Sequence, residues 1–430
     1  MNPHVAQMLI RRSRRGFYDF LKPGVEVRQD DPFTLEALED GVKVKMYRSG
    51  SWTNSVAVEY ATTSSPEYAA YKIDTSNSLT SGAVVSLNAG EKVSFIGNNP
   101  DGLANTNAVQ YHAFAVSGRF AARGNLHTLV LKDAYIGSGY SGMLKPQEVS
   151  LPPNAFPSLF RGCSGLTVAP ALPATTLADR CYMQMFYGCS GLTSAPALPA
   201  TTLAVSCYSG MFWGCSGLTS APALPATTLA ARCYMPMFYG CTGLTVAPAL
   251  PATTLAGDCY NGMFWGCSGL TSAPALPATT LADRCYSGMF RSCTGLTVAP
   301  ALPATTLAVS CYSGMFWSCS GLTSVPALPA TTLAINCYSD MFHSCSGIAA
   351  EAVAVLPAGE LVSGCYSNMF NYAGRLDSID VSFTKWKTSE NCTTNWVKGL
   401  VRSGSFRKPS ALETVRGDSG IPSGWAVSNK

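Results

Sequence analysis

The sequence has little charge and no long apolar run. Charged residues make up 13 % of its 430 residues, against about a quarter in typical soluble domains. The formal net charge of +4 is small for this length, so it does not indicate a nucleic-acid-binding protein. No apolar run reaches the roughly 18 residues of a membrane span, so we expect no transmembrane helix and no membrane insertion.

The motifs of common enzymes are also missing. The chain has no Walker loop, dinucleotide fingerprint or nucleophile elbow. Residues 161–374 hold no repeated carboxylate pair of the kind that glycoside hydrolysis needs. No C-x-x-C spacing occurs, which argues against zinc. The few histidines lie in different segments: His4, His112, His127 and His343. We therefore expect a non-enzymatic protein with no catalytic residue, no metal site and no cofactor.

The first 30 residues form a basic leader rather than a secretory signal. No apolar segment follows their positive charges, and no small-residue cleavage site is present. With Met1 in place, we expect the chain to act without secretory export. Such a leader is either a solvated end or a segment that anchors the chain to a larger assembly. The anchoring candidates are Arg11, Arg12, Arg14 and Arg15.

A repeat organises the middle of the chain. The segment CYSGMFWGCSGLTSAPALPATTLAAR, residues 207–232, recurs every 26 residues from about Cys163 to Cys345. Self-similarity at this period predicts a solenoid, in which each unit buries its apolar face against its neighbours. We expect about eight such coils between residues 161 and 374.

Each unit predicts one helix and one short strand. Leu203, Cys207 and Met211 recur at i, i+4 and i+8, which predicts a helix over 202–213. The preceding threonine pair then serves as the N-cap, and Gly214 takes the C′ position. The residues 192–195 predict a strand that Pro196 ends. This is the plan of an α/β leucine-rich-repeat solenoid, which we expect to be right-handed.

Sixteen of the 17 cysteines follow the repeat in two columns. Such columns favour stacked, buried thiols, with disulfide bridges as the alternative. Cys392 has no equivalent in the repeat. One column is Cys181, Cys207, Cys233, Cys259, Cys285, Cys311, Cys337 and Cys365, and the other is Cys163, Cys189, Cys215, Cys241, Cys267, Cys293, Cys319 and Cys345. The recurring tyrosines, among them Tyr182, are expected in the core with their hydroxyls at its rim.

Different patterns flank the repeat. Short alternating runs between turn residues predict an antiparallel, immunoglobulin-like β-sandwich over 31–131. Its strands are expected at 43–48, 55–60, 68–73, 83–87, 92–97 and 111–118, and the turn Asn88-Ala89-Gly90 predicts that the fourth and fifth form a hairpin. Residues 132–160 are expected to cap the start of the solenoid. Residues 375–430 are expected to cap its end with a strand, a helix and two further strands.

One outward column varies between copies while the inner positions stay constant. On the predicted helix, Trp213 projects away from the apolar face, with Ser206 and Ser209 beside it. Exposed aromatic rings can stack on sugars or anchor a protein partner. Packing between coils, or burial under another subunit, is the alternative. This candidate ligand- or partner-binding column is Tyr187, Trp213, Tyr239, Trp265, Arg291, Trp317 and His343.

The repeat resembles a known family. MFxGCxGLTxAPALPATTLAxxCY is similar to the BspA-like leucine-rich repeats of gut Bacteroidales surface proteins. The segments DPFTLEALEDGVKVKMY and SLNAGEKVSFIGN resemble the β-sandwich that precedes such arrays, and TTNWVKGLVRSGSF and SGIPSGWAV resemble the closing module. The resemblance covers about residues 31–430. It implies extracellular adhesion or recognition without catalysis, in bacteria or in the bacteriophages that infect them.

The basic leader, residues 1–30, distinguishes a bacterial protein from a bacteriophage protein. Bacterial members are expected to carry an export signal, whereas virion proteins assemble inside the host and need none. We therefore expect a bacteriophage virion protein of fibre or decoration type, a homo-oligomer held to other virion proteins by its N-terminal segment. Its ligand is expected to be a host surface glycan or protein. The alternatives are a bacterial cell-surface adhesin and a scaffold whose aromatic column is a subunit interface.

Overall fold

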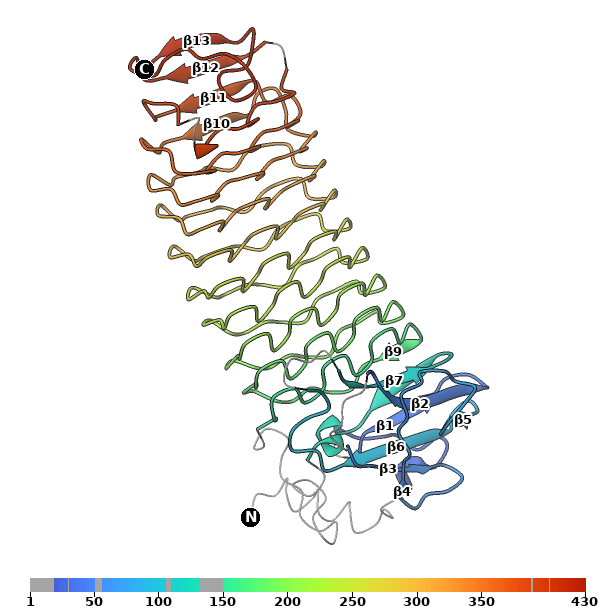
Figure 1. The fold of residues 1–430 in the computed structure, drawn as a ribbon. Coiled ribbons are helices and arrows are strands. Elements are labelled where there is room, and N and C mark those ends of the chain that lie inside the picture. The colour runs from blue at the N-terminus through green and yellow to red at the C-terminus, as the bar shows by residue number, and fades with distance from the viewer. Residues whose placement is uncertain are drawn as a thin grey trace, which may run out of the picture.

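The protein is a long rod that is mainly β. The computed structural model describes residues 19–29, 31–50, 56–105, 110–131, 150–387, 390–401 and 403–430. Within these ranges the structure has no α-helix, and its two complete 3-10 turns are η1 (Asp19–Leu21) and η2 (Leu126–Leu129). Figure 1 shows a rod of stacked coils with one group of strands at each end.

Two sheets make up the N-terminal module, which we define as the described residues of 19–131. Phe114 of one sheet lies with its ring centroid 5.0 Å from that of Phe95 in the other, so the sheets share one core. The strands are β1 (Thr34–Ala37), β2 (Val42–Arg48), β3 (Val58–Thr62), β4 (Ala69–Ala70), β5 (Val85–Leu87), β6 (Lys92–Gly97), β7 (His112–Val116), β8 (Phe120–Arg123) and, from the first coil, β9 (Leu166–Val168). Their orders are β4-β3-β6-β1-β8-β9 and β5-β2-β7.

The pairing of these strands differs from the sequence prediction. All six predicted strands are present: the bounds of β6 match the prediction, β2 begins one residue earlier, β3 is shifted toward the C-terminus, and β4, β5 and β7 are shorter. The strands β1 and β8 were not predicted. The predicted hairpin is wrong, because β5 pairs with β2 whereas β6 pairs with β1 and β3. The turn itself exists: the Glu91 N–H donates to the Asn88 carbonyl at 2.9 Å. It carries the chain from one sheet to the other.

Two buried lysines join distant segments of this module. The Lys45 ammonium lies 2.9 Å from the Asp74 carboxylate and donates to the Ser81 carbonyl at 2.8 Å. The Lys92 ammonium donates to the carbonyls of Lys22 and Val25 at 2.8 and 2.6 Å. Both side chains are fully buried, so these partners offset the desolvation of each charge. Lys92 thereby holds the segment after η1 against the sheet.

The coil stack, residues 154–399, is a ribbon of consecutive turns. The N–H of Met211 donates within its coil to the Tyr208 carbonyl at 3.1 Å, whereas the N–H of Gly210 donates to Met235 in the next coil at 2.9 Å. The same alternation runs through residues 206–215. Every fourth residue there has a positive φ: Ser206 (56°), Gly210 (61°) and Gly214 (71°). A positive φ at the third turn position is the mark of a type II turn.

The predicted helix over 202–213 is therefore wrong. The spacing of Leu203, Cys207 and Met211 reflects a turn ribbon that repeats every four residues rather than a helix. A helix N-cap is likewise absent at Thr202, which forms a parallel bridge with Thr176 of the preceding coil. Ser206 was expected to point outward, yet its side chain is buried. Gly214 does adopt the left-handed conformation, but inside the ribbon rather than after a helix.

The predicted strand of the repeat shrinks to single parallel bridges, which join Ser194, Ser220 and Val246. Ser194 forms an isolated parallel bridge with Ser220, and no longer strand exists at 192–195. The following residues, 195–200, make no backbone hydrogen bond to any residue that the structure describes. Two of these six residues are prolines, which lack the N–H that a ladder needs. This segment runs without backbone pairing and buries the side chains of Leu198 and Ala200 in the core.

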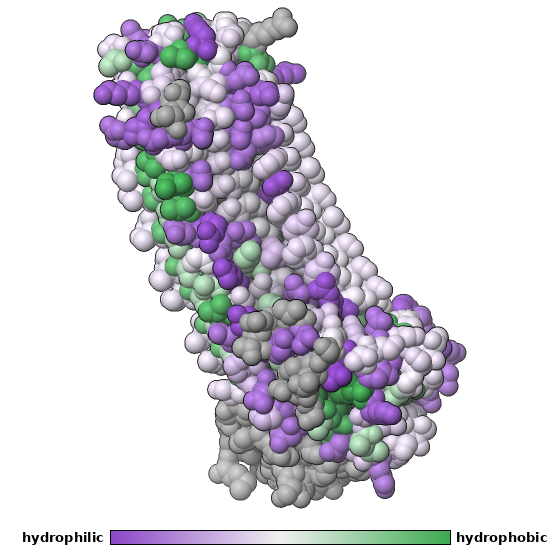
Figure 2. Space-filling view, viewed as in Figure 1, coloured by the Kyte–Doolittle hydropathy of each residue, from purple (hydrophilic) through white to green (hydrophobic). Residues whose placement is uncertain are grey.

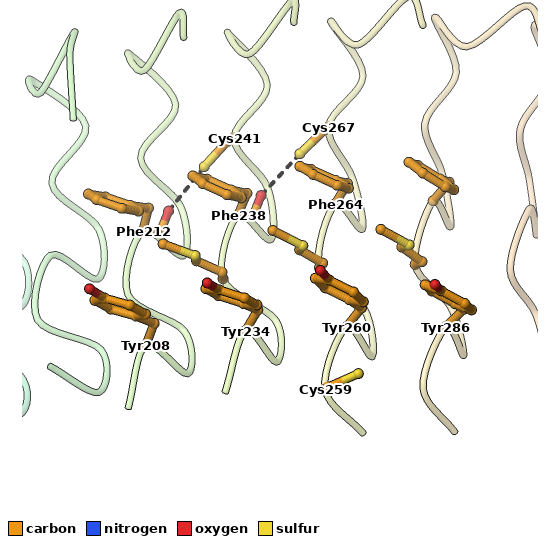
Figure 3. Close-up of a cluster of buried hydrophobic side chains, with 14 of the residues drawn as sticks. Tyr208, Phe212, Tyr234, Phe238, Cys241, Cys259, Tyr260, Phe264, Cys267 and Tyr286 are labelled. Atoms are coloured by element: carbon orange, nitrogen blue, oxygen red, sulfur yellow. Dashed lines mark hydrogen bonds between the residues drawn. The ribbon is translucent and has the colours of Figure 1, made fainter. Parts of the chain in front are cut away.

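Columns of identical side chains fill the stack. The tyrosine rings, such as Tyr208 and Tyr234, stack with centroids 5.9 Å apart at 4°, and the rings of Phe212 and Phe238 at 5.6 Å and 6°. Figure 3 shows both rows one coil behind another. The tyrosines are buried as predicted, but at Tyr286 the hydroxyl is also buried and has no hydrogen-bond partner among the described residues. Each coil therefore buries its rings on the rings of its neighbours.

All 17 cysteines are buried free thiols. The Cys241 thiol donates to the Phe212 carbonyl of the preceding coil at 3.0 Å, and the other members of that column repeat this bond (Figure 3). Burial raises the pKa of Cys215 to about 12, so its thiol stays protonated and unreactive. The prediction that Cys392 lacks an equivalent is wrong: the Tyr366 N–H donates to its carbonyl at 2.8 Å, which makes it the last member of the first column.

The two ends of the stack are closed by β structure. At the start, β8 pairs in parallel with β9, so the N-terminal module continues into the first coil. At the other end, a parallel sheet is formed by β10 (Val353–Leu356), β11 (Ser378–Val381), β12 (Ser405–Lys408) and β13 (Ala426–Asn429). The predicted helix around Trp396 is instead one more coil of turns, and the Trp396 ring lies 6.4 Å from Phe370.

Candidate recognition surface

The seven predicted column residues lie together along one side of the coil stack. We name them the outer ladder: Tyr187, Trp213, Tyr239, Trp265, Arg291, Trp317 and His343. All seven side chains are half-buried. Each directly follows a buried phenylalanine, and the next residue adopts a positive φ, as Gly214 does after Trp213. The constant core thus fixes the place of each variable side chain.

Neighbouring members of the outer ladder touch. Their ring centroids are 5.4 Å apart for Tyr187 and Trp213, 4.3 Å for Trp213 and Tyr239, and 5.1 Å for Tyr239 and Trp265. The planes are tilted by 31–54°. The ring faces are therefore directed largely at one another, which leaves mainly ring edges and polar tips for a partner. This geometry combines the packing that the sequence offered as an alternative with an outward surface.

Arg291 interrupts the aromatic run. Its guanidinium carbon lies 4.4 Å from the Trp265 ring centroid and 3.8 Å from that of Trp317, so an indole covers each face. Beyond Trp317, the ladder continues to the His343 ring at a centroid distance of 4.6 Å. Cation and rings thus form one continuous stack.

Glycine makes room for the tryptophans. A Cβ built at Gly262 would lie 3.8 Å from Cε3 of Trp265, and one at Gly314 would lie 3.7 Å from the same atom of Trp317. The indoles therefore rest over the glycines three residues earlier in their own coils. Coils with tyrosine carry a larger residue there, such as Gln184 before Tyr187. The residue three positions earlier thus varies together with the ladder ring.

The electrostatics of the outer ladder are concentrated in its second half. Burial lowers the pKa of Arg291, partly opposed by the carboxylate of Asp340. Burial also lowers the pKa of His343, opposed by Asp340 and reinforced by Arg291. The Ser344 hydroxyl lies 2.9 Å from Nδ1 of His343. Near neutral pH the ladder therefore carries one fixed positive charge, at Arg291.

The sequence analysis did not identify Arg161 at the start of the outer ladder, or the serines that follow Arg291 and Trp317. Arg161 extends the ladder at its start, with its guanidinium 3.9 Å from the Tyr187 centroid and a bond of 2.7 Å to the Gln184 amide oxygen. Ser292 and Ser318 take the left-handed position after Arg291 and Trp317, where the four preceding coils have glycine. The exchange of Gly for Ser in consecutive repeats was the available signal.

The candidate sites outside the outer ladder give less support for a function. Arg11, Arg12, Arg14 and Arg15 lie outside the described residues, so their anchoring role stays a prediction. A shallow groove of about 440 Å³ lies between two coils and is lined only by alanine, leucine and proline, among them Pro248 and Pro274. The threonine pairs, such as Thr201 and Thr202, are exposed in rows. Figure 2 shows strongly hydrophilic side chains gathered mostly at the two ends of the rod.

No metal site or membrane-spanning helix emerges from the described ranges. No group of three or more His, Cys, Asp or Glu side chains there is arranged to hold a metal ion. None of the described helices has the length and apolar character needed to cross a membrane. Comparison with protein-family models, with curated proteins and with solved structures gives no match to this chain.

Proposed function

We propose that the protein is a non-enzymatic recognition protein of a bacteriophage virion, of fibre or decoration type. In this proposal the N-terminal module is an immunoglobulin-like sandwich that serves as the base. The coil stack is a leucine-rich-repeat-like solenoid built from turns. The outer ladder is the surface that meets a glycan or protein of the host.

The observation that carries the proposal is the division of each coil into constant and variable residues. Tyrosine, phenylalanine and cysteine columns repeat without change and are buried. The outer ladder changes from coil to coil, from Trp213 through Arg291 to His343, although every member occupies the same place. Packing alone would be served by one repeated residue, since identical rings already stack well in the core. Variation on a fixed frame is what recognition of a specific partner requires.

The thiols support a virion over a secreted adhesin. Seventeen cysteines without a disulfide are typical of proteins that mature in a reducing compartment. A virion protein assembles in the host cytoplasm, where thiols stay reduced. The resemblance of the repeat to BspA-like arrays, which occur in bacteria and in their bacteriophages, supports the same setting.

The test compares two triple variants of the full chain. Trp213→Ala, Trp265→Ala and Trp317→Ala together alter the outer ladder. Thr202→Ala, Thr228→Ala and Thr254→Ala together alter an exposed column elsewhere on the coils and serve as the control. We expect the ladder variant to lose at least about tenfold in binding to Bacteroidales cells, as is usual when interface aromatics are truncated. The threonine variant should bind as the wild type does.

Two results would overturn the proposal. Equal binding by the ladder variant would remove the outer ladder from recognition. Antibodies against the chain that label bacterial surfaces but never virions would replace the virion setting by that of a cell-surface adhesin. Circular dichroism of both variants shows whether a loss of binding reflects unfolding.

A second candidate is a scaffold in which the outer ladder is a subunit interface. It is favoured by the half-burial of all seven ladder side chains within one chain, which leaves a row of ring edges that a second copy can cover. It predicts a homo-oligomer that the ladder variant dissociates into monomers. Sedimentation of wild type and variant at the same concentration separates it from host recognition.

A further inference from the structure

Arg291 presents a charged donor group that the described part of the chain does not use. Its side chain makes no hydrogen bond and no ion pair with any residue that the structure describes. The other arginine stacked on this column, Arg161, instead donates to Gln184 at 2.7 Å. The described part of the chain therefore leaves the hydrogen-bonding capacity of one stacked guanidinium open.

The stacking fixes how that guanidinium can be approached. Trp265 and Trp317 cover its two faces at 4.4 and 3.8 Å, so only its edge remains for a ligand. The edge of a guanidinium carries N–H donors in a fixed fork that matches the two oxygens of a carboxylate. A planar carboxylate can lie in the guanidinium plane between the indoles, whereas a tetrahedral sulfate or phosphate projects oxygens toward both rings.

Further unused donors lie in the same two coils. Ser292 directly follows Arg291, and Ser318 directly follows Trp317. Neither hydroxyl bonds to a described residue. Both serines hold a positive φ, at 58° and 59°, where glycine would be unstrained. Because Ser292 and Ser318 directly follow Arg291 and Trp317, their hydroxyls add open hydrogen-bonding capacity to the same two coils.

We propose that Arg291, held between Trp265 and Trp317 and flanked by Ser292 and Ser318, binds the carboxylate of an acidic polysaccharide. The guanidinium donates from its edge to the two carboxylate oxygens, and the serine hydroxyls donate to sugar or carboxylate oxygens. The adjacent indole edges line the path of the neighbouring sugars along the stack. This inference rests on the proposed recognition function and names its ligand class.

The test uses the full chain and three polymers of defined charge. Polygalacturonate carries carboxylates, dextran sulfate carries sulfates, and dextran is neutral. Binding of the wild type to oligomers of each is measured by calorimetry at fixed ionic strength. We expect binding to the carboxylate polymer, at least tenfold weaker binding to the sulfated one, and none to dextran.

Variants then locate the site. Arg291→Trp introduces a residue that the same column already holds in three other coils, so the stack should stay folded. It should lower affinity for oligogalacturonate by at least about tenfold, the usual scale for a lost charge-assisted pair. Arg291→Lys keeps the charge without the planar fork and should lose most of the same affinity. Arg232→Lys, at an exposed arginine of the coils outside the outer ladder, is the matched control and should bind as the wild type does.

The contrary outcomes are distinct from those of the proposed function. No binding of the wild type to oligogalacturonate, or equal binding by Arg291→Trp, overturns the carboxylate site. Tighter binding to dextran sulfate than to polygalacturonate overturns the choice of carboxylate. In any of these cases, host cells that bind the wild type but not the triple tryptophan variant would still support recognition by the outer ladder. Only the assignment of an acidic ligand would then be wrong.

Discussion

The N-terminal module and the coil stack reach a buried core by opposite means. In the module, contacts join residues far apart in sequence, and buried lysines such as Lys45 and Lys92 are satisfied by specific partners. In the stack, the buried rings contact their equivalents about 26 positions away, and the tyrosine, phenylalanine and cysteine columns that fill the core are uncharged. The module depends on individual polar bonds, whereas the stack depends on repetition.

This difference predicts how the two regions respond to damage. A lost core side chain in the stack affects its own coil and the two neighbours, because each unit contacts only those next to it. A lost polar partner in the module affects segments throughout the domain.

Truncation of a stacked ring should give the largest effect. Phe238→Ala removes a fully buried ring that contacts Phe212 and Phe264 at 5.6 and 5.7 Å. We expect a loss of about 3–5 kcal/mol in the free energy of unfolding of the stack, the usual range for Phe→Ala in a core. Hydrogen exchange should locate the damage, with faster exchange in the coils around residue 238 and unchanged exchange in β1 to β8. Equal acceleration in the module would contradict a stack that responds locally.

Acid should weaken the module more than the stack. Burial lowers the pKa of His127 from 6.5 to about 4, so the unfolded chain takes up a proton that the folded module resists. Stability is therefore complete above pH 6.5 and is lost as the pH falls toward 4. At 1.36 kcal/mol per pKa unit, the loss from this residue is about 3 kcal/mol.

The variant His127→Phe tests that assignment. A phenylalanine retains the ring that lies 6.2 Å from Phe156 but cannot be protonated. His112 has a pKa lowered to about 4 by the same cause, so the variant should remove about half of the acid slope of the module. Urea unfolding at several pH values between 4 and 7 measures it. A slope that the variant leaves unchanged would show that other groups govern acid stability.

The ion pairs of the stack should contribute less. The Asp258 carboxylate lies 2.8 Å from the Arg284 guanidinium and 3.6 Å from that of Arg232, which joins three coils. Both arginines are more than half exposed, so the pairs themselves are weak. Asp258 also has a φ of 57°, a left-handed conformation that would cost an alanine at this position about 1–2 kcal/mol.

Two substitutions of Asp258 separate the effect of the lost ion pairs from that of the backbone strain. Asp258→Ala loses the ion pairs and keeps the strain, and we expect a loss of about 1–2 kcal/mol in total. Asp258→Gly loses the same pairs but relieves the strain, so it should be closer to the wild type. Thermal unfolding compares the two. A glycine variant as unstable as the alanine variant would assign the effect to the ion pairs.

How far the sequence could predict these structures follows from the same comparison. The repeat identified the core of the stack, because buried columns such as Tyr208 and Phe212 recur in every copy. The local conformation predicted from the repeat was wrong, because the i, i+4 spacing of Leu203, Cys207 and Met211 fits a helix as well as a turn ribbon. Over four residues a helix drifts by about 40°, so the strict spacing from Leu203 to Cys215 argued against it. Gly210, in the middle of the segment, is a second sign against a helix.

The module shows the opposite limit. The positions of its strands could be predicted from the alternation of apolar and polar residues. Their pairing could not be predicted, because a pair such as β2 and β5 depends on contacts between residues far apart in sequence. The candidate site lies between these cases. The column from Tyr187 to His343 could be predicted from variation at one repeat position. That the rings cover one another, and that Arg291 is held between two of them, required the geometry of the stack.

The smallest expected effect tests the turn ribbon directly. If Thr202 capped a helix, Thr202→Ala would cost about 1 kcal/mol. In the ribbon the Thr202 side chain is exposed, and its carbonyl accepts the Leu177 N–H at 3.0 Å whichever side chain is present. We therefore expect a change below about 0.5 kcal/mol, the usual limit for surface substitutions. Gly210→Ala is the informative companion, because its φ of 61° makes alanine costly here by about 1–2 kcal/mol. A helix would reverse the two results, since it favours alanine over glycine by about 1 kcal/mol and needs its N-cap.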